Sequence, residues 1–167
     1  EIDADGFLRV TDRKKELLIT SGGKNIAPQH LEGKLKQIAA VSQAVAIGDR
    51  RPYVVALLTL DPLRVAAEAE KAGSPARTPE DAVGCPVFKA YVEKQVEVIN
   101  KGLARYESIK KIALLPSELS VETGELTPTL KVKRRVVAEK YKAMIDGLYE
   151  KAEMMDASVD KGSDKMM

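Results

Sequence analysis

VSQAVAIGDRRPYVVALLTLD (residues 41–61) predicts two β-strands joined by a turn at GDRRP. The second strand, residues 53–60, is apolar on both faces, a pattern typical of a strand buried inside a sheet. KKIALLP, residues 110–116, predicts a third short strand. With 167 residues, of which 44% are hydrophobic, the chain has room for one domain around this sheet. We therefore expect the second strand to be the central one.

Two hairpin patterns and a helix precede this stretch. Within residues 1–13 a DADG turn comes before alternating apolar and polar residues, which predicts a hairpin. Residues 17–20 are predicted to form a short strand that is followed by a Gly-Gly turn. A helix is expected to begin at Pro28 and to end near Ala39, because its apolar residues recur at helical spacing.

Helices are also expected after the second strand. Asp61 should cap a helix that ends at Gly73, and Thr78 should start a single helical turn. A final amphipathic helix should begin at about Lys133. Before it, a longer amphipathic helix is predicted by apolar residues on one stripe: Phe88, Tyr91, Val92, Val96, Ile99, Leu103 and Tyr106.

These elements predict an α+β fold, with a small few-stranded mixed sheet flanked by helices and an N-terminal β-hairpin. Residues 1–150 should form the domain, and residues 151–167, where the periodicity ends, are expected to be a disordered tail. Because the chain opens inside a predicted hairpin without an initiator methionine, we expect it to be a piece of a longer protein.

Composition narrows the class of partner. The net charge is only +2, which argues against wholesale binding to nucleic acid or membrane, so a basic site must be local. Cys85 is the single cysteine, which excludes an internal disulfide and favours a reducing cytoplasm. His30 is the single histidine, and we expect a surface or capping role rather than a metal site. No run of about 20 apolar residues occurs in the sequence.

Basic residues are concentrated at the start of the last predicted helix. LTPTLKVKRRVV, residues 126–137, carries four cations at the end where the helix dipole is already positive. The repulsion between the dipole and each cation in the first turn destabilises the helix by up to about 0.3–1 kcal/mol. Free backbone N–H groups and cations at a helix start suit a phosphate or carboxylate ligand. The alternatives are a solvated basic face and a non-enzymatic module that binds nucleic acid or anionic lipid.

DRKKELLITSGGKNIAP, residues 12–28, and TGELTPTLKVKRRVV, residues 123–137, together resemble the adenylate-forming acyl-CoA synthetase superfamily, above all its long-chain fatty-acyl-CoA synthetases. The resemblance covers residues 1–149 and implies the small, mobile C-terminal domain of such an enzyme. It implies a two-step reaction: a carboxylate attacks the α-phosphate of ATP to give acyl-adenylate, and after domain rotation the thiol of coenzyme A displaces AMP.

By this resemblance, Lys131 is the adenylation lysine that bridges the substrate carboxylate and the α-phosphate oxygens. A cation is required there because two anions must approach each other. The commoner form of the motif has glycine before this lysine, and here Leu130 takes that place. Arg134 and Arg135 are interpreted mainly as surface or domain-docking charges.

The first loop is implied to serve domain rotation and the second half-reaction. Lys15 occupies the hinge position, and Arg13 matches an arginine that reaches the ribose and phosphate region of the adenylate. Gly22, Gly23 and Lys24 are expected at the wall of a pantetheine tunnel, where residues without a Cβ let the backbone approach a thin ligand.

The resemblance also implies the ligands and partners. ATP and coenzyme A would be used together with Mg²⁺, the ion being bound outside this segment. The domain would work against its own N-terminal adenylation domain on a fatty acid, and the isolated segment should be inactive. We expect no nucleic-acid partner, whereas the intact enzyme has a possible peripheral membrane contact. A carrier protein instead of coenzyme A stays open as the acyl acceptor.

Overall fold

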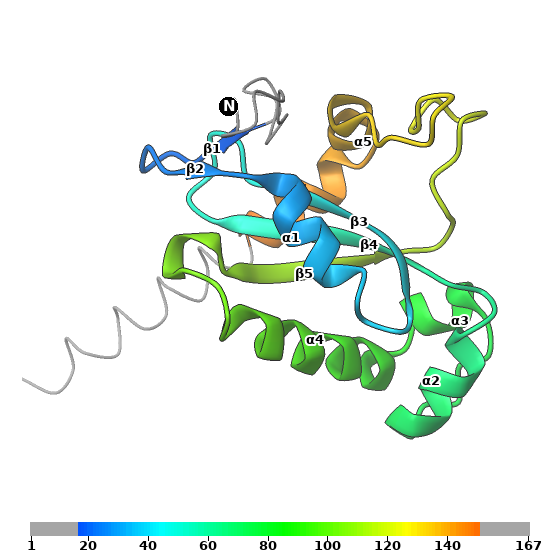
Figure 1. Ribbon diagram of the computed structural model, residues 1–167. Helices are drawn as coiled ribbons and strands as arrows, with labels where there is room; N and C mark the ends of the chain where they lie inside the picture. The colour runs from blue at the N-terminus through cyan, green and yellow to red at the C-terminus, as the bar shows by residue number, and fades with distance from the viewer. Residues whose placement is uncertain (1–16, 151–167) are drawn as a thin grey trace, which may run out of the picture.

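A computed structural model of the chain describes residues 17–150, and its centre is a three-stranded sheet (Figure 1). The strands are β3 (Val41–Ile47), β4 (Val54–Leu60) and β5 (Ile109–Leu115), in the order β3-β4-β5. β3 and β4 are antiparallel, whereas β4 and β5 are parallel, so the sheet is mixed. All residues of β4 are buried, which confirms the prediction that this strand is central.

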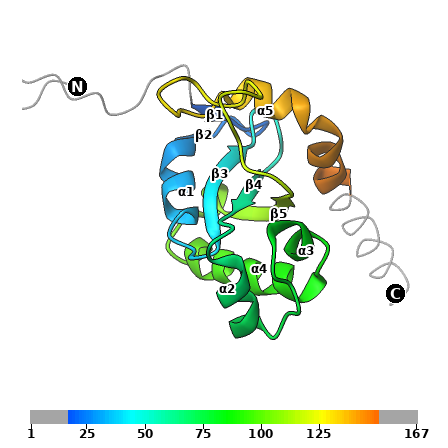
Figure 2. The same ribbon diagram turned by 90° about the vertical axis from the view of Figure 1, so that its right-hand side faces the viewer.

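Helices cover both faces of the sheet. Along β4, Val54, Ala56 and Leu58 belong to one hydrophobic cluster, which also takes in residues of the helices on that face: α1 (Pro28–Leu35), α2 (Val65–Ala72), α3 (Pro79–Val83) and α4 (Pro86–Asn100). Val55 and Leu57 face a second cluster beneath α5 (Arg134–Lys140) and the helical residues 142–150. In Figure 2 α5 and the orange segment after it lie on the side of the sheet opposite α1.

A two-stranded hairpin precedes α1. β1 (Leu18–Ile19) pairs antiparallel with β2 (Asn25–Ile26), and the Thr20 N–H donates to the Lys24 carbonyl at 3.0 Å inside the turn. The Gly-Gly turn predicted from the sequence is therefore confirmed. The hairpin expected within residues 1–13 and the tail expected at 151–167 lie outside the described residues.

Two helices are shorter than the sequence predicts: α1 ends earlier, and α2 begins later. α1 ends at Leu35 rather than near Ala39, because the chain turns back to enter β3, and the Val41 N–H donates to the Ile38 carbonyl at 3.0 Å. α2 begins at Val65, since the Asp61 carboxylate closes a turn with the Leu63 N–H at 2.9 Å instead of capping the helix directly. The left-handed Gly73, with φ of 74°, ends α2 as predicted.

The long helix α4 is also shorter than its apolar stripe. Asn100 ends it by bonding with both side-chain groups to the backbone of Ile109, at 2.9 Å each, and so ties the helix to the first residue of β5. Leu103 and Tyr106 therefore lie beyond α4, with Tyr106 in the short 3₁₀ helix η2 (Arg105–Glu107). The last predicted helix is interrupted at Tyr141, so that α5 and residues 142–150 are separate. No helix within 17–150 is long and apolar enough to cross a bilayer.

Candidate functional site

Lys131 lies on a small loop that is closed at its base. Leu126 and Val132 form an isolated antiparallel bridge. Inside it, the Thr127 N–H donates to the Lys131 carbonyl at 2.8 Å, and the Lys131 N–H donates to the Thr127 hydroxyl at 3.0 Å. The Leu130 N–H donates to the Thr127 carbonyl at 2.8 Å. These bonds fix the backbone on both sides of Lys131 while its side chain is left exposed.

Leu130 has a left-handed backbone, with φ of 63°. This conformation costs a residue with a Cβ roughly 1–2 kcal/mol, which explains why glycine suits the position. The Leu130 side chain is 67% exposed, so packing contributes little to offset this cost. The loop therefore keeps the backbone path that a glycine would take, although the residue is a leucine.

The four cations of this region have different surroundings. Among the described residues no ion pair involves Lys131 or Lys133, and both are exposed. Arg135 is exposed as well, and its Nε lies 3.4 Å from the Glu139 carboxylate one helical turn away. Lys131 thus presents a charged ammonium to solvent at a fixed backbone position.

Arg134 differs from its neighbours because it points into the protein. Its guanidinium is ion-paired with the buried Glu32 of α1, and its Nε donates to the Ala46 carbonyl of β3 at 3.2 Å. The same Glu32 carboxylate accepts the Ala46 N–H at 3.0 Å. The interpretation of Arg134 as a surface or docking charge is therefore wrong. Its side chain joins α5 to α1 and β3.

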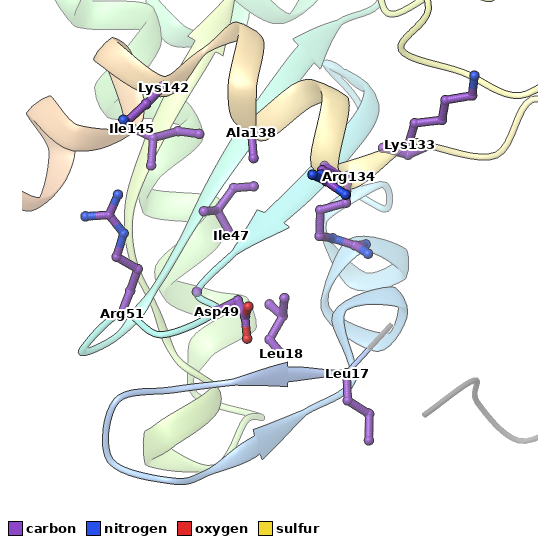
Figure 3. A pocket seen from close by; sticks show the side chains of 13 residues that line it. Leu17, Leu18, Ile47, Asp49, Arg51, Lys133, Arg134, Ala138, Lys142 and Ile145 are labelled. Carbon is purple, nitrogen blue, oxygen red and sulfur yellow. The ribbon is translucent and has the colours of Figure 1, made fainter. Parts of the chain in front are cut away.

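A cleft of about 630 Å³ opens beside α5, between that helix, the start of the hairpin and the end of β3 (Figure 3). Arg51 at its rim is held by Asp146 at 2.5 Å and lies over the Tyr149 ring, 4.7 Å from its centroid. Lys133 and Lys142 add positive charge to the lining, whereas Lys131 is not part of it. The cleft thus adjoins the end of the lysine loop, at Val132, without including Lys131 itself.

The glycine loop has an open backbone. Gly23 has φ of +81°, and no atom lies within 4 Å of where its Cβ would be. At Gly22 the nearest atom to such a Cβ is the Thr20 hydroxyl oxygen at 3.9 Å. A ligand therefore has free approach to the backbone of both glycines. In Figure 1 this turn and the yellow lysine loop lie at opposite ends of the upper edge of the domain.

A second hollow, of about 540 Å³, lies beside the glycine loop. It is lined by Gly22 and Lys24, by Arg105 and Tyr106 of η2, and by Lys110 near the start of β5. The Lys24 ammonium lies 5.5 Å from the centroid of the Tyr106 ring, within cation–π range. The sequence did not indicate Arg105, Tyr106 and Lys110 as site residues. Tyr106 continues the apolar stripe of the preceding helix, and Lys110 falls in the predicted strand of residues 110–116.

Other chemically capable residues in the described part of the chain form no further site. His30 is exposed, and no group of three or more His, Cys, Asp or Glu side chains within 17–150 is arranged for a metal ion. Cys85 directly precedes α4, with its sulfur 3.1 Å from the Ser74 hydroxyl oxygen. That hydroxyl and the N–H groups of Phe88 and Val87 lower the pKa of the thiol. Arg13 and Lys15 lie outside the described residues, so their roles stay predictions.

Known structures share this fold. The A domain of carboxylic acid reductase from Segniliparus rugosus, solved in complex with AMP and a co-purified carboxylic acid, superposes with a TM-score of 0.66 and 23% identity, over 84% of this chain and 21% of that chain. At this level of identity the likeness is one of fold.

Sequence relatives are more similar. The long-chain-fatty-acid–CoA ligase FadD15 of Mycobacterium tuberculosis is 42% identical over 151 residues, which are 90% of this chain and 25% of the relative. The long-chain-fatty-acid–CoA ligase ACSBG1 of Mus musculus is 40% identical over 167 aligned positions, covering 89% of this chain and 23% of the relative. The chain thus spans about a quarter of the length of these relatives. Its residues 15–153 match the model of the AMP-binding enzyme C-terminal domain, and the chain belongs to that family.

Proposed function

We propose that this chain is the mobile C-terminal domain of an ATP-dependent, AMP-forming ligase that activates a fatty acid and transfers it to coenzyme A. The observation that carries the proposal is the exposed Lys131 on its closed loop, within a domain whose relatives are long-chain-fatty-acid–CoA ligases. The remainder of the active site would belong to the N-terminal adenylation domain. The isolated domain is therefore expected to be inactive.

In the first half-reaction Lys131 would bind oxygen atoms of both substrates. A carboxylate oxygen of the fatty acid attacks the α-phosphorus of ATP, and the bond from that phosphorus to the bridging oxygen of pyrophosphate breaks. Two anions approach in this step, and a cation about 4 Å from a unit negative charge gains roughly 4 kcal/mol at an effective dielectric near 20. The unpaired ammonium of Lys131 suits this role, since no internal carboxylate competes for it among the described residues. We assign the Mg²⁺ that accompanies ATP to the rest of the enzyme.

In the second half-reaction the glycine loop would face the adenylate. The sulfur of coenzyme A attacks the acyl carbonyl carbon, and the bond from that carbon to the AMP oxygen breaks. Gly22 and Gly23 would border the pantetheine arm, because their open backbone leaves space for a thin chain. Lys24 and the other cations of the neighbouring hollow, together with Tyr106, would bind the phosphorylated nucleotide end.

The exchange between half-reactions requires rotation of the whole domain. The turn of the hairpin and the yellow lysine loop lie at opposite ends of the domain (Figure 1), so we do not expect both to face one reacting centre together. We assign the hinge of this rotation to Lys15 and the nucleotide contact to Arg13.

A carrier protein is the alternative acyl acceptor, since it also presents a pantetheine arm. A tethered arm has no adenosine, however, and would leave the hollow of Lys24, Arg105 and Tyr106 without a ligand. The hollow therefore favours coenzyme A. A non-enzymatic basic module is disfavoured because Arg134 is engaged inside the protein and the net charge is only +2.

The test uses the full-length enzyme that contains this domain. ATP–pyrophosphate exchange with palmitate should fall by several orders of magnitude in Lys131→Ala, while thioester formation from preformed palmitoyl-adenylate should be retained. Lys133→Ala is the matched control, because it removes an exposed lysine two residues away and should preserve exchange to within a few-fold. Unchanged exchange in Lys131→Ala, or an equal fall in both variants, would refute the assignment.

A further inference from the structure

Glu125 is a carboxylate buried immediately before the lysine loop. It is only 1% exposed, and it directly precedes Leu126, which forms the bridge at the base of the loop. A carboxylate removed from water needs several compensating partners, since an unpaired buried charge is strongly unfavourable. The partners of Glu125 therefore indicate why a charge is present here.

Those partners come from both sides of the loop. The Lys140 ammonium in α5 donates to the Glu125 carboxylate at 3.1 Å, the Thr123 hydroxyl donates to the same oxygen, and the Tyr141 hydroxyl lies 3.5 Å from the other oxygen. The hydrogen bond to Glu125 raises the pKa of Lys140. On the backbone, the Lys133 N–H donates to the Glu125 carbonyl at 2.8 Å.

Glu125 thus connects the two ends of the lysine loop. Its carbonyl holds Lys133, the residue just before α5, and its carboxylate holds Lys140, the last residue of α5. The base of the loop of residues 126–132 cannot shift relative to α5 without breaking one of these bonds. α5 is in turn tied to α1 and β3 through Arg134, so a continuous set of contacts runs from the sheet to the loop.

Stability alone is a weak explanation for this arrangement. A buried ion pair contributes little more than apolar residues of the same size would, because desolvation offsets most of the attraction. What the pair supplies is a fixed geometry, and a shift of about 1 Å in a catalytic group is able to cost about 100-fold in rate.

We propose that Glu125 is a positioning residue for Lys131, which acts through the ion pair with Lys140 to hold the lysine loop where adenylation needs it. The proposal rests on the proposed function, in which Lys131 binds the reacting oxygens. Glu125 itself touches neither substrate: its effect is on the rate of the first half-reaction and not on substrate affinity or on thioester formation.

The experiment measures both half-reactions in the full-length enzyme. Glu125→Gln keeps the shape and removes the charge, and we expect kcat of ATP–pyrophosphate exchange to fall about 10- to 100-fold. KM for ATP and palmitate should change by less than about threefold, and thioester formation from preformed palmitoyl-adenylate should be retained. Lys140→Met should give the same pattern: a lower kcat of exchange, with KM and thioester formation retained. The double variant Glu125→Gln/Lys140→Met should lose little more activity than either single variant. Lys140→Arg, which keeps the positive charge, should exchange nearly as well as wild type.

The outcomes separate this proposal from the proposed function. If Lys131→Ala abolishes exchange but folded Glu125→Gln and Lys140→Met both exchange normally, only the positioning role is refuted. An equal loss in both half-reactions would mean a merely structural role and would also refute it. If Lys131→Ala exchanges normally, both proposals fail. Should Glu125→Gln not fold, Lys140→Met decides, because Lys140 is partly exposed and its truncation is better tolerated.

Discussion

Arg134 and Glu32 form an ion pair that joins residues 102 positions apart in the sequence. The pair brings the first residue of α5 against α1, and both side chains also bond to the backbone of Ala46. Removing one partner of a buried pair leaves the other charge uncompensated. The loop that carries Lys131 therefore depends on a contact far from it in the chain.

We expect Arg134→Ala to lower the free energy of unfolding by about 3 kcal/mol, measured by chemical denaturation of the domain. Arg135→Ala is the matched control, because Arg135 is 91% exposed, and its loss should change stability by no more than about 0.5 kcal/mol. Equal effects of the two substitutions would contradict the internal role of Arg134.

Leu130 provides a test of backbone strain in the lysine loop. Leu130→Gly removes the cost of the left-handed conformation, whereas Leu130→Ala keeps it. The glycine variant should be at least as stable as the alanine variant, although glycine makes the unfolded chain more flexible. Differential scanning calorimetry of both variants compares their midpoints. A glycine variant that melts clearly below the alanine variant would show that the strain is small.

The two glycines of the hairpin should respond differently to a methyl group. Gly23→Ala forces a residue with a Cβ to adopt φ of +81°, and we expect a loss of about 1 kcal/mol in the free energy of unfolding. Gly22→Ala should be nearly neutral, since the nearest atom to the new methyl lies 3.9 Å away. Urea denaturation of the two variants, measured side by side, tests this order.

The basic hollow should bind the nucleotide end of coenzyme A. In the full-length enzyme, Lys24→Ala should raise KM for coenzyme A about fivefold. This factor corresponds to the loss of roughly 1 kcal/mol, as expected for one charged contact at the surface. ATP–pyrophosphate exchange should be unchanged. Pantetheine, which lacks the nucleotide, is the control acceptor: wild type and variant should use it equally. A fivefold difference with pantetheine would place the effect elsewhere.

Tyr149 should make the domain sensitive to alkali. Burial raises the pKa of its phenol above the usual value of about 10, and the hydroxyl donates to the Tyr53 carbonyl at 2.8 Å. Above pH 10 the unfolded chain releases this proton while the folded domain keeps it, so stability should fall by up to about 1.4 kcal/mol per pH unit. Tyr149→Phe should be less stable than wild type at pH 7. Above pH 10, its free energy of unfolding, measured by urea denaturation, should fall less steeply with pH than that of wild type. If the free energies of unfolding of wild type and Tyr149→Phe fell equally with pH, the ionisation of Tyr149 would not be the cause.

The strands and the lysine loop were predictable because they depend on local patterns. Continuous apolar residues in 53–60 indicated a strand with two covered faces, and the region around Lys131 and Gly22 resembled known motifs. These signals need only a short window of sequence. Arg13 and Lys15 were identified in the same way, but they lie outside the described residues.

The remaining features depend on distant contacts. Nothing in the sequence beside Arg134 distinguishes it from Arg135, and only the approach of α1 makes one buried and leaves the other in solvent. Tyr106 continued the apolar stripe of α4, yet Asn100 ends that helix by bonding to the start of β5. Glu125 was not identified either, because its partner Lys140 approaches only after α5 has docked.

The ion pair at Ala46 also protects the rim of the sheet. Within residues 17–150, β3 pairs with a strand on one side only, β4, so its other side offers backbone N–H and carbonyl groups to an extended chain. At Ala46 the outward N–H is taken by Glu32 and the outward carbonyl by Arg134. Two side chains thus occupy the hydrogen-bonding groups of Ala46, through which a second molecule could begin to add a strand. A variant that lacks either side chain would expose this part of the rim to intermolecular β-pairing and aggregation.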